Sequence, residues 1–421
     1  MSVIKKSGSV FGSQWASVLI SNAIAVMQLV FLTRTLGVES FGVYASYLGV
    51  FSIVLVIQEF GVRNLILGVD SATLHDYRFY EYLLILGLGL AVGLQLGLLL
   101  VGFQLVSSLS IGLCALSVAI TSMVSTSLFA QGMLHKDAAF KVLLKSLVLA
   151  SFVVLLSFSS RVEFLFVAWT VINVLISVVF IRYVAKTRAG SRLPMSDRAW
   201  ISSLSIQSKT HLGRALRFNL VDLASAVYIR FGVITLACLG YPDASIGLFA
   251  LALRFPELVI QLLTPVAYMA LLRWKEGPVS LDRASVWVLL VGFVMVFVGG
   301  GFVLICFGGD LIAWIFGAGY RSTVDVLEVV YLAIPFMVFN LFAGHLLLAR
   351  GHALEMFYIV TVACCVGYAV AMSSDGAAVA RWGEILLLCE GVQAFLLFVY
   401  VKCFLRGGSA FSVAGPTKES V

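Results

Sequence analysis

Long uninterrupted apolar segments constrain this chain more than any other feature. They follow one another over 421 residues with short polar connections, and a helix needs roughly 20 apolar residues to cross a bilayer. Backbone polar groups inside lipid must be hydrogen-bonded within the membrane, so only helices and closed barrels span it. Continuous apolar runs, rather than ten-residue alternation, favour helices. The sequence therefore predicts an all-α polytopic membrane protein.

The composition leaves no room for a soluble domain. Hydrophobic residues make up 61% of the chain and charged residues 12%, whereas soluble domains carry about 25% charged residues. The apolar excess extends over the whole length. The first apolar run continues to about Thr33, which is too long for a signal peptide, so we expect it to be the first span.

The apolar runs predict twelve spans, six on each side of the longest loop, at about 10–33, 42–64, 79–103, 108–131, 139–158, 162–182, 215–238, 246–270, 284–307, 325–349, 354–373 and 383–404. We expect four parts in order along the chain: an N-terminal six-helix lobe, a basic cytoplasmic linker, a C-terminal six-helix lobe and a polar cytoplasmic tail, at 1–190, 191–213, 214–405 and 406–421.

The placement of Lys and Arg predicts the orientation, because cytoplasmic loops are enriched in both. With the N-terminus inside, the outside loops hold only four basic residues, Arg34, Arg161, Arg321 and Arg381. We assign Lys136, Lys141 and Lys145 to the cytoplasmic side. Both termini are therefore expected in the cytoplasm. The basic linker is either a topology determinant or a binding site for anionic lipid headgroups.

Two pairs of short motifs indicate an internal repeat. Leu36-Gly37-x4-Gly42-Val43-Tyr44 resembles Leu239-Gly240-x6-Gly247-Leu248-Phe249, and Leu128-Phe129-Ala130-Gln131-Gly132 resembles Leu347-Leu348-Ala349-Arg350-Gly351. Because six helices separate the copies, both halves run in the same direction. We expect a parallel repeat with the substrate path between its halves.

No catalytic or metal-binding signature is present. The chain has no GxxxxGK[ST] loop and no HExxH motif, and its seven cysteines lie in or beside apolar segments without a CxxC pair. We therefore expect no enzyme activity, no metal and no cofactor, although a proton or sodium gradient could drive the protein.

Ionisable groups at membrane depth are the best candidates for function, because they are costly to bury. Arg230 and Arg254 lie within predicted spans, and Pro256 invites a kink beside the second. Either these helices line a substrate cavity, or Arg230 and Arg254 form structural ion pairs with Asp222 and Glu257. The candidate substrate-binding residues are Arg254, Arg230, Arg63, Gln28, Gln58, Tyr228 and Gln261.

A second set of ionisable residues could couple transport to an ion. The candidates are Asp222, Glu257, Glu390 and Glu59. Glu59 and Arg63 have the i, i+4 spacing of a helical ion pair. They could equally be a purely structural pair, or Arg63 could reach the headgroups.

The motifs together resemble the O-antigen and polysaccharide flippases of the multidrug/oligosaccharidyl-lipid/polysaccharide exporter superfamily. The resemblance rests on the turn at Arg34–Tyr44, on Glu59-Phe60-Gly61, on Gly247–Pro256 and on Phe316-Gly317-Ala318-Gly319-Tyr320. It covers nearly the whole chain. The peptidoglycan-precursor flippases, which are also similar, carry an arginine–acid pair in the first helix, where this chain has Met27-Gln28.

This resemblance implies two six-helix lobes that alternate between inward- and outward-open states in the bacterial inner membrane. It implies a cationic cavity that accepts an undecaprenyl-diphosphate-linked oligosaccharide, with Arg254 at the family's eighth-helix arginine. The expected function is a flippase for an O-antigen or similar lipopolysaccharide unit, with a polymerase and a chain-length regulator as partners and no nucleic acid. The alternatives are a multidrug or cation antiporter of the same superfamily and a membrane-embedded polysaccharide polymerase.

Overall fold

The computed structural model describes residues 2–61, 105–130, 133–159, 161–188, 206–276, 283–349, 352–373 and 379–406, together with 89, 92, 93 and 96. All regular structure in these ranges is helical. The helices are α1 (Ser2–Glu59), α4 (Leu105–Ala130), α5 (Leu134–Leu156), α6 (Val162–Arg188), α7 (Ile206–Cys238), α8 (Asp243–Glu276), α9 (Arg283–Phe316), the short 3-10 helix η2 (Ala318–Tyr320), α10 (Thr323–Ala349), α11 (Ala353–Met372) and α12 (Val379–Arg406).

These helices confirm the predicted fold class. Among the described residues, nine helices are long and apolar enough to cross a membrane, or ten if the bent α7 counts as one. The predicted third span, 79–103, lies almost entirely outside the described ranges, as do the tail and most of the basic linker. The two predicted lobes stay a prediction.

The first two predicted spans form α1, which is interrupted at Gly37. Gly37 has φ 73° and ψ 175°, which is not helical, and a left-handed φ is a conformation that glycine adopts without strain. Gly240, its partner in the predicted repeat, has a matching φ of 72°. A glycine with left-handed φ therefore follows both Leu36 and Leu239.

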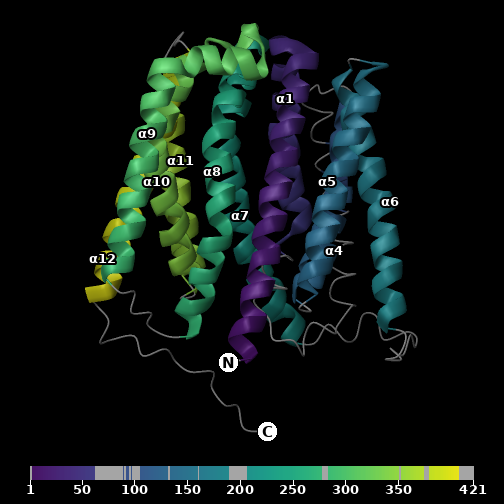
Figure 1. Ribbon diagram of the computed structural model, residues 1–421, viewed down its shortest axis with the longest axis vertical. Helices are drawn as coiled ribbons and strands as arrows, with labels where there is room; N and C mark the ends of the chain where they lie inside the picture. The colour runs from purple at the N-terminus through teal and green to yellow at the C-terminus, as the bar shows by residue number, and fades with distance from the viewer. Residues whose placement is uncertain are drawn as a thin grey trace. The chain divides into compact units, whose positions relative to one another are not determined.

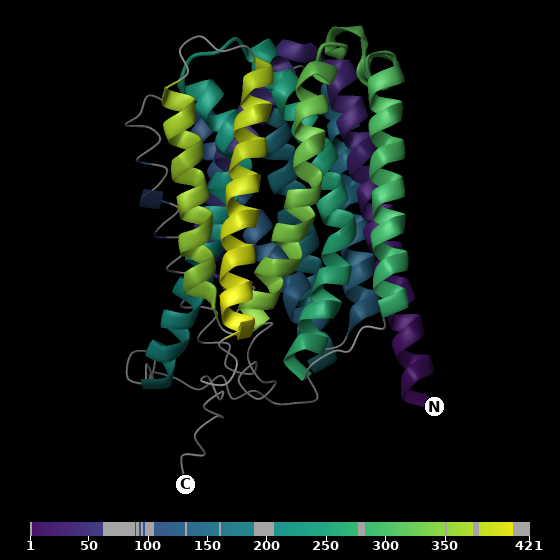
Figure 2. The same cartoon turned by 90° about the vertical axis from the view of Figure 1, so that its left-hand side faces the viewer.

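The chain divides into two compact units. The first comprises Met1–Arg254 and Phe302–Leu327, and the second comprises Phe255–Gly301 and Glu328–Val421. In the first unit α1 packs against α4, α5 and α7, and α4 packs against α6 (Figure 1). In the second unit α11 and α12 lie side by side (Figure 2).

A reciprocal contact relates the two glycine motifs. A Cβ added at Gly42 would overlap the Asp243 carbonyl oxygen, and a Cβ added at Gly247 would lie 2.5 Å from the Val38 carbonyl oxygen. Val38 precedes Gly42 by four residues, as Asp243 precedes Gly247. Two equivalent segments that contact each other reciprocally are related by a two-fold rotation. The contact therefore supports the parallel repeat.

The second pair of motifs also has a common backbone. Met133 N–H donates to the Leu128 carbonyl and His352 N–H donates to the Leu347 carbonyl, both at 2.9 Å. Both residues then begin a helix from nearly the same conformation, with φ, ψ of −82°, 51° for Met133 and −87°, 49° for His352. The repeat can therefore be compared residue by residue around these two bonds.

The Gly37 end of the first unit is held by contacts from α9 and η2. Arg34 donates hydrogen bonds to the last carbonyls of α9, at 2.8 Å to Ile315 and also to Trp314, where helix carbonyls lack intrahelical partners. The Tyr320 hydroxyl donates to the Thr33 carbonyl at 3.4 Å, and its ring lies edge-on to Phe41 at 5.9 Å. Burial raises the pKa of the Tyr320 phenol, because the charged form loses its hydration.

Candidate functional sites

The two predicted mid-span arginines both interact electrostatically with one buried tyrosine. Tyr44 on α1 is 5% exposed, and the charges of Arg254 on α8 and Arg230 on α7 act on its phenol. Both arginines are half-buried, and each has further interactions within the protein. The sequence hypothesis that α7 and α8 line one substrate cavity stays a prediction.

The other predicted substrate residues differ in their exposure to solvent. Gln58 is 2% exposed and its amide donates to the Gly112 carbonyl at 3.3 Å, so it links α1 to α4. Tyr228 is buried, Gln28 is half-buried and Gln261 is exposed. Arg63 lies outside the described residues, so the predicted pair between Glu59 and Arg63 is not described either.

Among the predicted ion-coupling carboxylates, Glu390 is the one that is deeply buried. It is 2% exposed on α12, and Asn340 Nδ2 on α10 donates to its Oε2 at 2.6 Å. Asp222, Glu257 and Glu59 are half-buried. A carboxylate enclosed in a span is costly unless its charge is compensated or protonated.

The first half has a neutral counterpart of this contact. Thr121 Oγ1 on α4 donates to Asn173 Oδ1 on α6 at 3.0 Å, and Asn173 Nδ2 donates to the Trp169 carbonyl at 2.7 Å. In both halves the fourth helix hydrogen-bonds to the sixth through a buried side-chain pair that includes an asparagine. Counting from Leu128 and Leu347, Thr121 corresponds to Asn340. Glu390 therefore stands where the first half has the amide Asn173, which cannot titrate.

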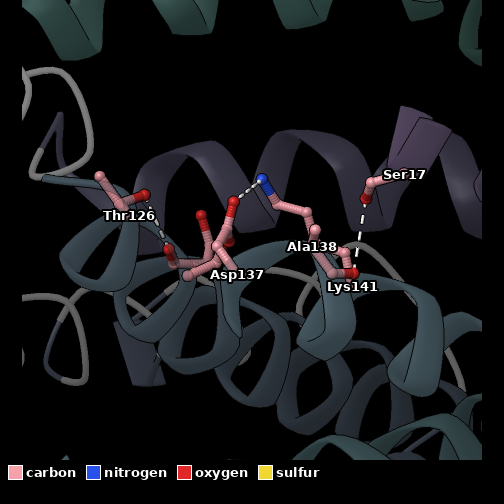
Figure 3. A network of polar contacts seen from close by, with 7 residues as sticks. Ser17, Thr126, Asp137, Ala138 and Lys141 are labelled. Carbon is pink, nitrogen blue, oxygen red and sulfur yellow. Dashed lines mark hydrogen bonds and ion pairs between the residues drawn. The ribbon is translucent and has the colours of Figure 1, made fainter. Parts of the chain in front are cut away.

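The sequence analysis missed a polar network at the start of α5. Asp137 is fully buried. Its carboxylate accepts a 2.5 Å hydrogen bond from the Ser125 hydroxyl and forms a 2.7 Å ion pair with Lys141. Ser17 on α1 donates to the adjacent Ala138 carbonyl at 3.4 Å (Figure 3). By the same repeat count, Ser125 and Asp137 correspond to Gly344 and Met356, which are also in contact. The spacing of Asp137, Lys141 and Lys145 along one helix face was the available sequence signal.

Within the described ranges, no group of three or more His, Cys, Asp or Glu side chains is arranged to hold a metal ion. No protein-family model and no curated protein sequence matches the chain.

Solved structures do match it over nearly its whole length. A MATE protein in complex with MaL6 is 14% identical and superposes with a TM-score of 0.60, covering 96% of this chain and 97% of its own. The eukaryotic MATE transporter AtDTX14 is 15% identical with a TM-score of 0.59, covering 95% of each chain. An inward-facing multidrug resistance MATE family transporter of the MOP superfamily is 15% identical with a TM-score of 0.55, covering 96% and 95%.

At this level of identity the likeness concerns the fold. Together with the helices, the reciprocal glycine contact and the two equivalent backbone turns, it shows that this chain has the all-α membrane fold of the MATE transporters of the MOP superfamily.

Proposed function

We propose that the chain is an ion-coupled transporter that exports small molecules by alternating access, in the manner of a multidrug or cation antiporter. Similar structures include inward-facing and outward-facing conformations of multidrug resistance MATE family transporters. Their fold is the support for alternating access here. The observation that carries the ion coupling is the Glu390 carboxylate, which is buried at 2% exposure against Asn340.

A buried carboxylate can alternate between a charged form that binds a cation and a neutral form that carries a proton. Asn340 supports the charged form by donating at 2.6 Å. Its own Oδ1 has no hydrogen-bond partner among the described residues, so after a side-chain rotation this oxygen can accept a hydrogen bond from the protonated carboxyl group or approach a small cation. The first half offers the amide Asn173 at the equivalent contact. The asymmetry favours coupling through the second half.

The test is transport by the purified protein in vesicles with an imposed proton or sodium gradient, and with ethidium as a cationic probe. Glu390→Gln keeps the size and hydrogen-bonding ability of the side chain but removes the titration. We expect it to abolish gradient-driven exchange. Glu384→Gln is the matched control, because Glu384 is exposed on the same helix. Gradient-driven exchange by Glu390→Gln at the wild-type rate would contradict the proposal.

A second candidate function is a flippase for an undecaprenyl-diphosphate-linked oligosaccharide in the bacterial inner membrane. The observation that favours it is the electrostatic interaction of both Arg230 and Arg254 with Tyr44, because arginine binds phosphate oxygens with a rigid fork of donors. One similar structure, from Pyrococcus furiosus, is described as a MOP superfamily transporter whose binding pocket has reverse polarity, which suggests a different function for it. A polymerase and a chain-length regulator would then be partners.

The two candidates give opposite results in a strain that depends on the protein. If the flippase proposal is right, Arg254→Ala causes lipid-linked repeat units to accumulate on the cytoplasmic leaflet, and ethidium is not transported. Arg321→Ala is the control, because Arg321 is exposed and pairs with Asp310. Full complementation by a variant with alanine at both Arg230 and Arg254 would rule the flippase out.

A further inference from the structure

Two segments from the two copies of the predicted repeat touch at one end of the first unit. They lie around Gly42 in α1 and around Gly247 in α8, and each approaches the backbone of the other too closely for a side chain. A third segment joins them, because a Cβ at Gly319 of η2 would lie 3.0 Å from the Val38 Cγ2 atom. A substrate path between two repeats is closed where the repeats touch in this way.

The contact continues along α1, where it forms a seam with α7. Gly42, Ala45 and Gly49 are spaced three and four residues apart, so they share one face of the helix. A Cβ at Gly49 would lie 3.0 Å from the Ile234 Cγ1 atom on α7, and Ala45, between the two glycines, is buried. Contacts between apolar groups can separate without leaving a buried donor or acceptor unpaired. The α1–α7 seam is therefore suited to repeated opening.

Arg34 ties the same end of α1 to α9 by hydrogen bonds that water can replace. Its Nε donates to the Ile315 carbonyl at 2.8 Å, and its Nη2 donates to the Trp314 carbonyl. The arginine is exposed, and the last carbonyls of a helix have no intrahelical partner. Water can therefore satisfy both sides when the contact breaks. Because the donor is charged, the contact is nevertheless stronger than a neutral hydrogen bond.

We propose that this end of the first unit is the outer gate of the transporter, described here in its closed state, and that Arg34 is its latch. The distribution of Lys and Arg predicts that this end faces outside. Opening exchanges the hydrogen bonds of Arg34 for water and separates α1 from α7. Removal of the latch therefore shifts the equilibrium toward the open gate and leaves the glycine contact itself unchanged. The inference rests on alternating access, which is part of the proposed function.

The test measures how often the α1–α7 seam opens. Ala45→Cys places a thiol in the seam of the full chain, in membrane vesicles whose outer face points outward. A membrane-impermeant maleimide is added outside, and its reaction rate at position 45 is read by peptide mass spectrometry, so the seven native cysteines can stay. Adding Arg34→Gln should raise this rate about threefold or more, since it removes two charge-assisted hydrogen bonds that water only partly replaces. Arg34→Lys, which keeps the charge and a donor, should raise it less.

Two controls distinguish a gate from a general loosening of the protein. Arg321→Gln removes another exposed arginine, whose ion pair with Asp310 does not involve α1, and it should leave the rate at position 45 unchanged. Ala119→Cys moves the thiol to a buried position in α4, away from the seam. Arg34→Gln should not increase the labelling there.

If Ala45→Cys does not fold, Val233→Cys gives the same measurement from the α7 side, because Val233 is buried and its Cγ1 atom would lie 3.8 Å from a Cβ at Gly49. The proposal is overturned if Arg34→Gln leaves the labelling rate in the seam unchanged. It is also overturned if Arg321→Gln raises that rate equally, or if labelling at position 119 rises as much. The labelling needs neither an ion gradient nor a substrate, so a failure of ion coupling through Glu390 would not alter its result.

Discussion

Asn340 and Glu390 are joined by a 2.6 Å hydrogen bond from the amide of one to the carboxylate of the other. The pair connects α10 to α12, as Thr121 and Asn173 connect α4 to α6. A neutral pair is therefore sufficient to pack these helices in one half, and the charge of Glu390 is an addition to the shared fold. Buried charge that the fold does not require is a sign of function.

At the start of α5 the comparison is reversed, because here the first half carries the buried charge and the second half does not. There the first half has the charged network of Asp137 and Lys141, and the second half has a contact between Gly344 and Met356. Each half thus carries one buried carboxylate at a position where the other half has none. Alternating access needs two halves of similar architecture, but it does not need them to share their chemistry.

A first prediction concerns the glycine contact. Gly42→Ala should destabilise the observed arrangement strongly, because the new methyl group would overlap the Asp243 backbone carbonyl and backbone cannot move aside cheaply. We expect at least about 2 kcal/mol of lost stability, seen as a lower thermal midpoint in detergent. Gly292→Ala is the control, since nothing lies within 4 Å of its position. Equal midpoints for the two variants would show that the Gly42–Gly247 approach is not as close as described.

A second prediction exchanges chemistry between the halves. Lys141→Val alone should cost about 2 kcal/mol, because it leaves the Asp137 carboxylate buried beside Ser125 without its cation. Adding Ser125→Gly and Asp137→Met, which reproduces the second half's Gly344 and Met356, should restore the thermal midpoint to near the wild-type value, since apolar replacements of buried ion pairs are often neutral. A triple variant less stable than Lys141→Val would contradict the repeat correspondence.

The sequence predicts the fold well because its signals are local. Apolar length defines the spans, and the motifs around Gly42 and Gly247 predict the repeat. Glu390 was identified as a candidate from its depth alone. Asp137 was missed because it lies near an expected cytoplasmic boundary, where charges are ordinary. Whether such a charge faces water or a neighbouring helix depends on tertiary packing.

The roles of individual polar residues were harder to predict for the same reason. Gln58 as a substrate-cavity residue stays a prediction, and the structure adds that its amide donates to the Gly112 backbone carbonyl. Any residue type has such a carbonyl, so nothing in the sequence marks that partner. Arg230 and Arg254 are different. Their charge within apolar runs is a strong signal, and both interact electrostatically with Tyr44.

A third prediction concerns pH. The Tyr320 phenol has a raised pKa because of its burial, so the folded state binds its proton more tightly than the unfolded state does. This contribution to stability is complete below the unfolded pKa of about 10 and is lost as pH rises through the folded value. The wild-type thermal midpoint should therefore fall above about pH 10 more steeply than that of Tyr320→Phe. Parallel curves for the two proteins would exclude Tyr320 as the cause.

A fourth prediction is a double-mutant cycle in α9 and α10. Tyr331 lies across the glycines of α9: its hydroxyl donates to the Phe297 carbonyl at 2.6 Å and its ring stacks on Phe297 at 4.8 Å. A Cβ at Gly300 would lie 2.5 Å from that hydroxyl but 3.5 Å from the nearest ring carbon. The hydroxyl alone therefore excludes a side chain at this position.

Tyr331→Phe should cost about 1 kcal/mol for the lost hydrogen bond. Gly300→Ala should cost more in the wild type, because the tyrosine must move. In the Tyr331→Phe background the same alanine meets only ordinary van der Waals contact, and it should be neutral or slightly stabilising, since alanine favours helix over glycine by up to about 1 kcal/mol. Tyr358→Phe, at a side chain that is 62% exposed, is the control background. If the costs of Gly300→Ala and Tyr331→Phe are strictly additive, the Tyr331 hydroxyl is not the reason why position 300 requires a glycine.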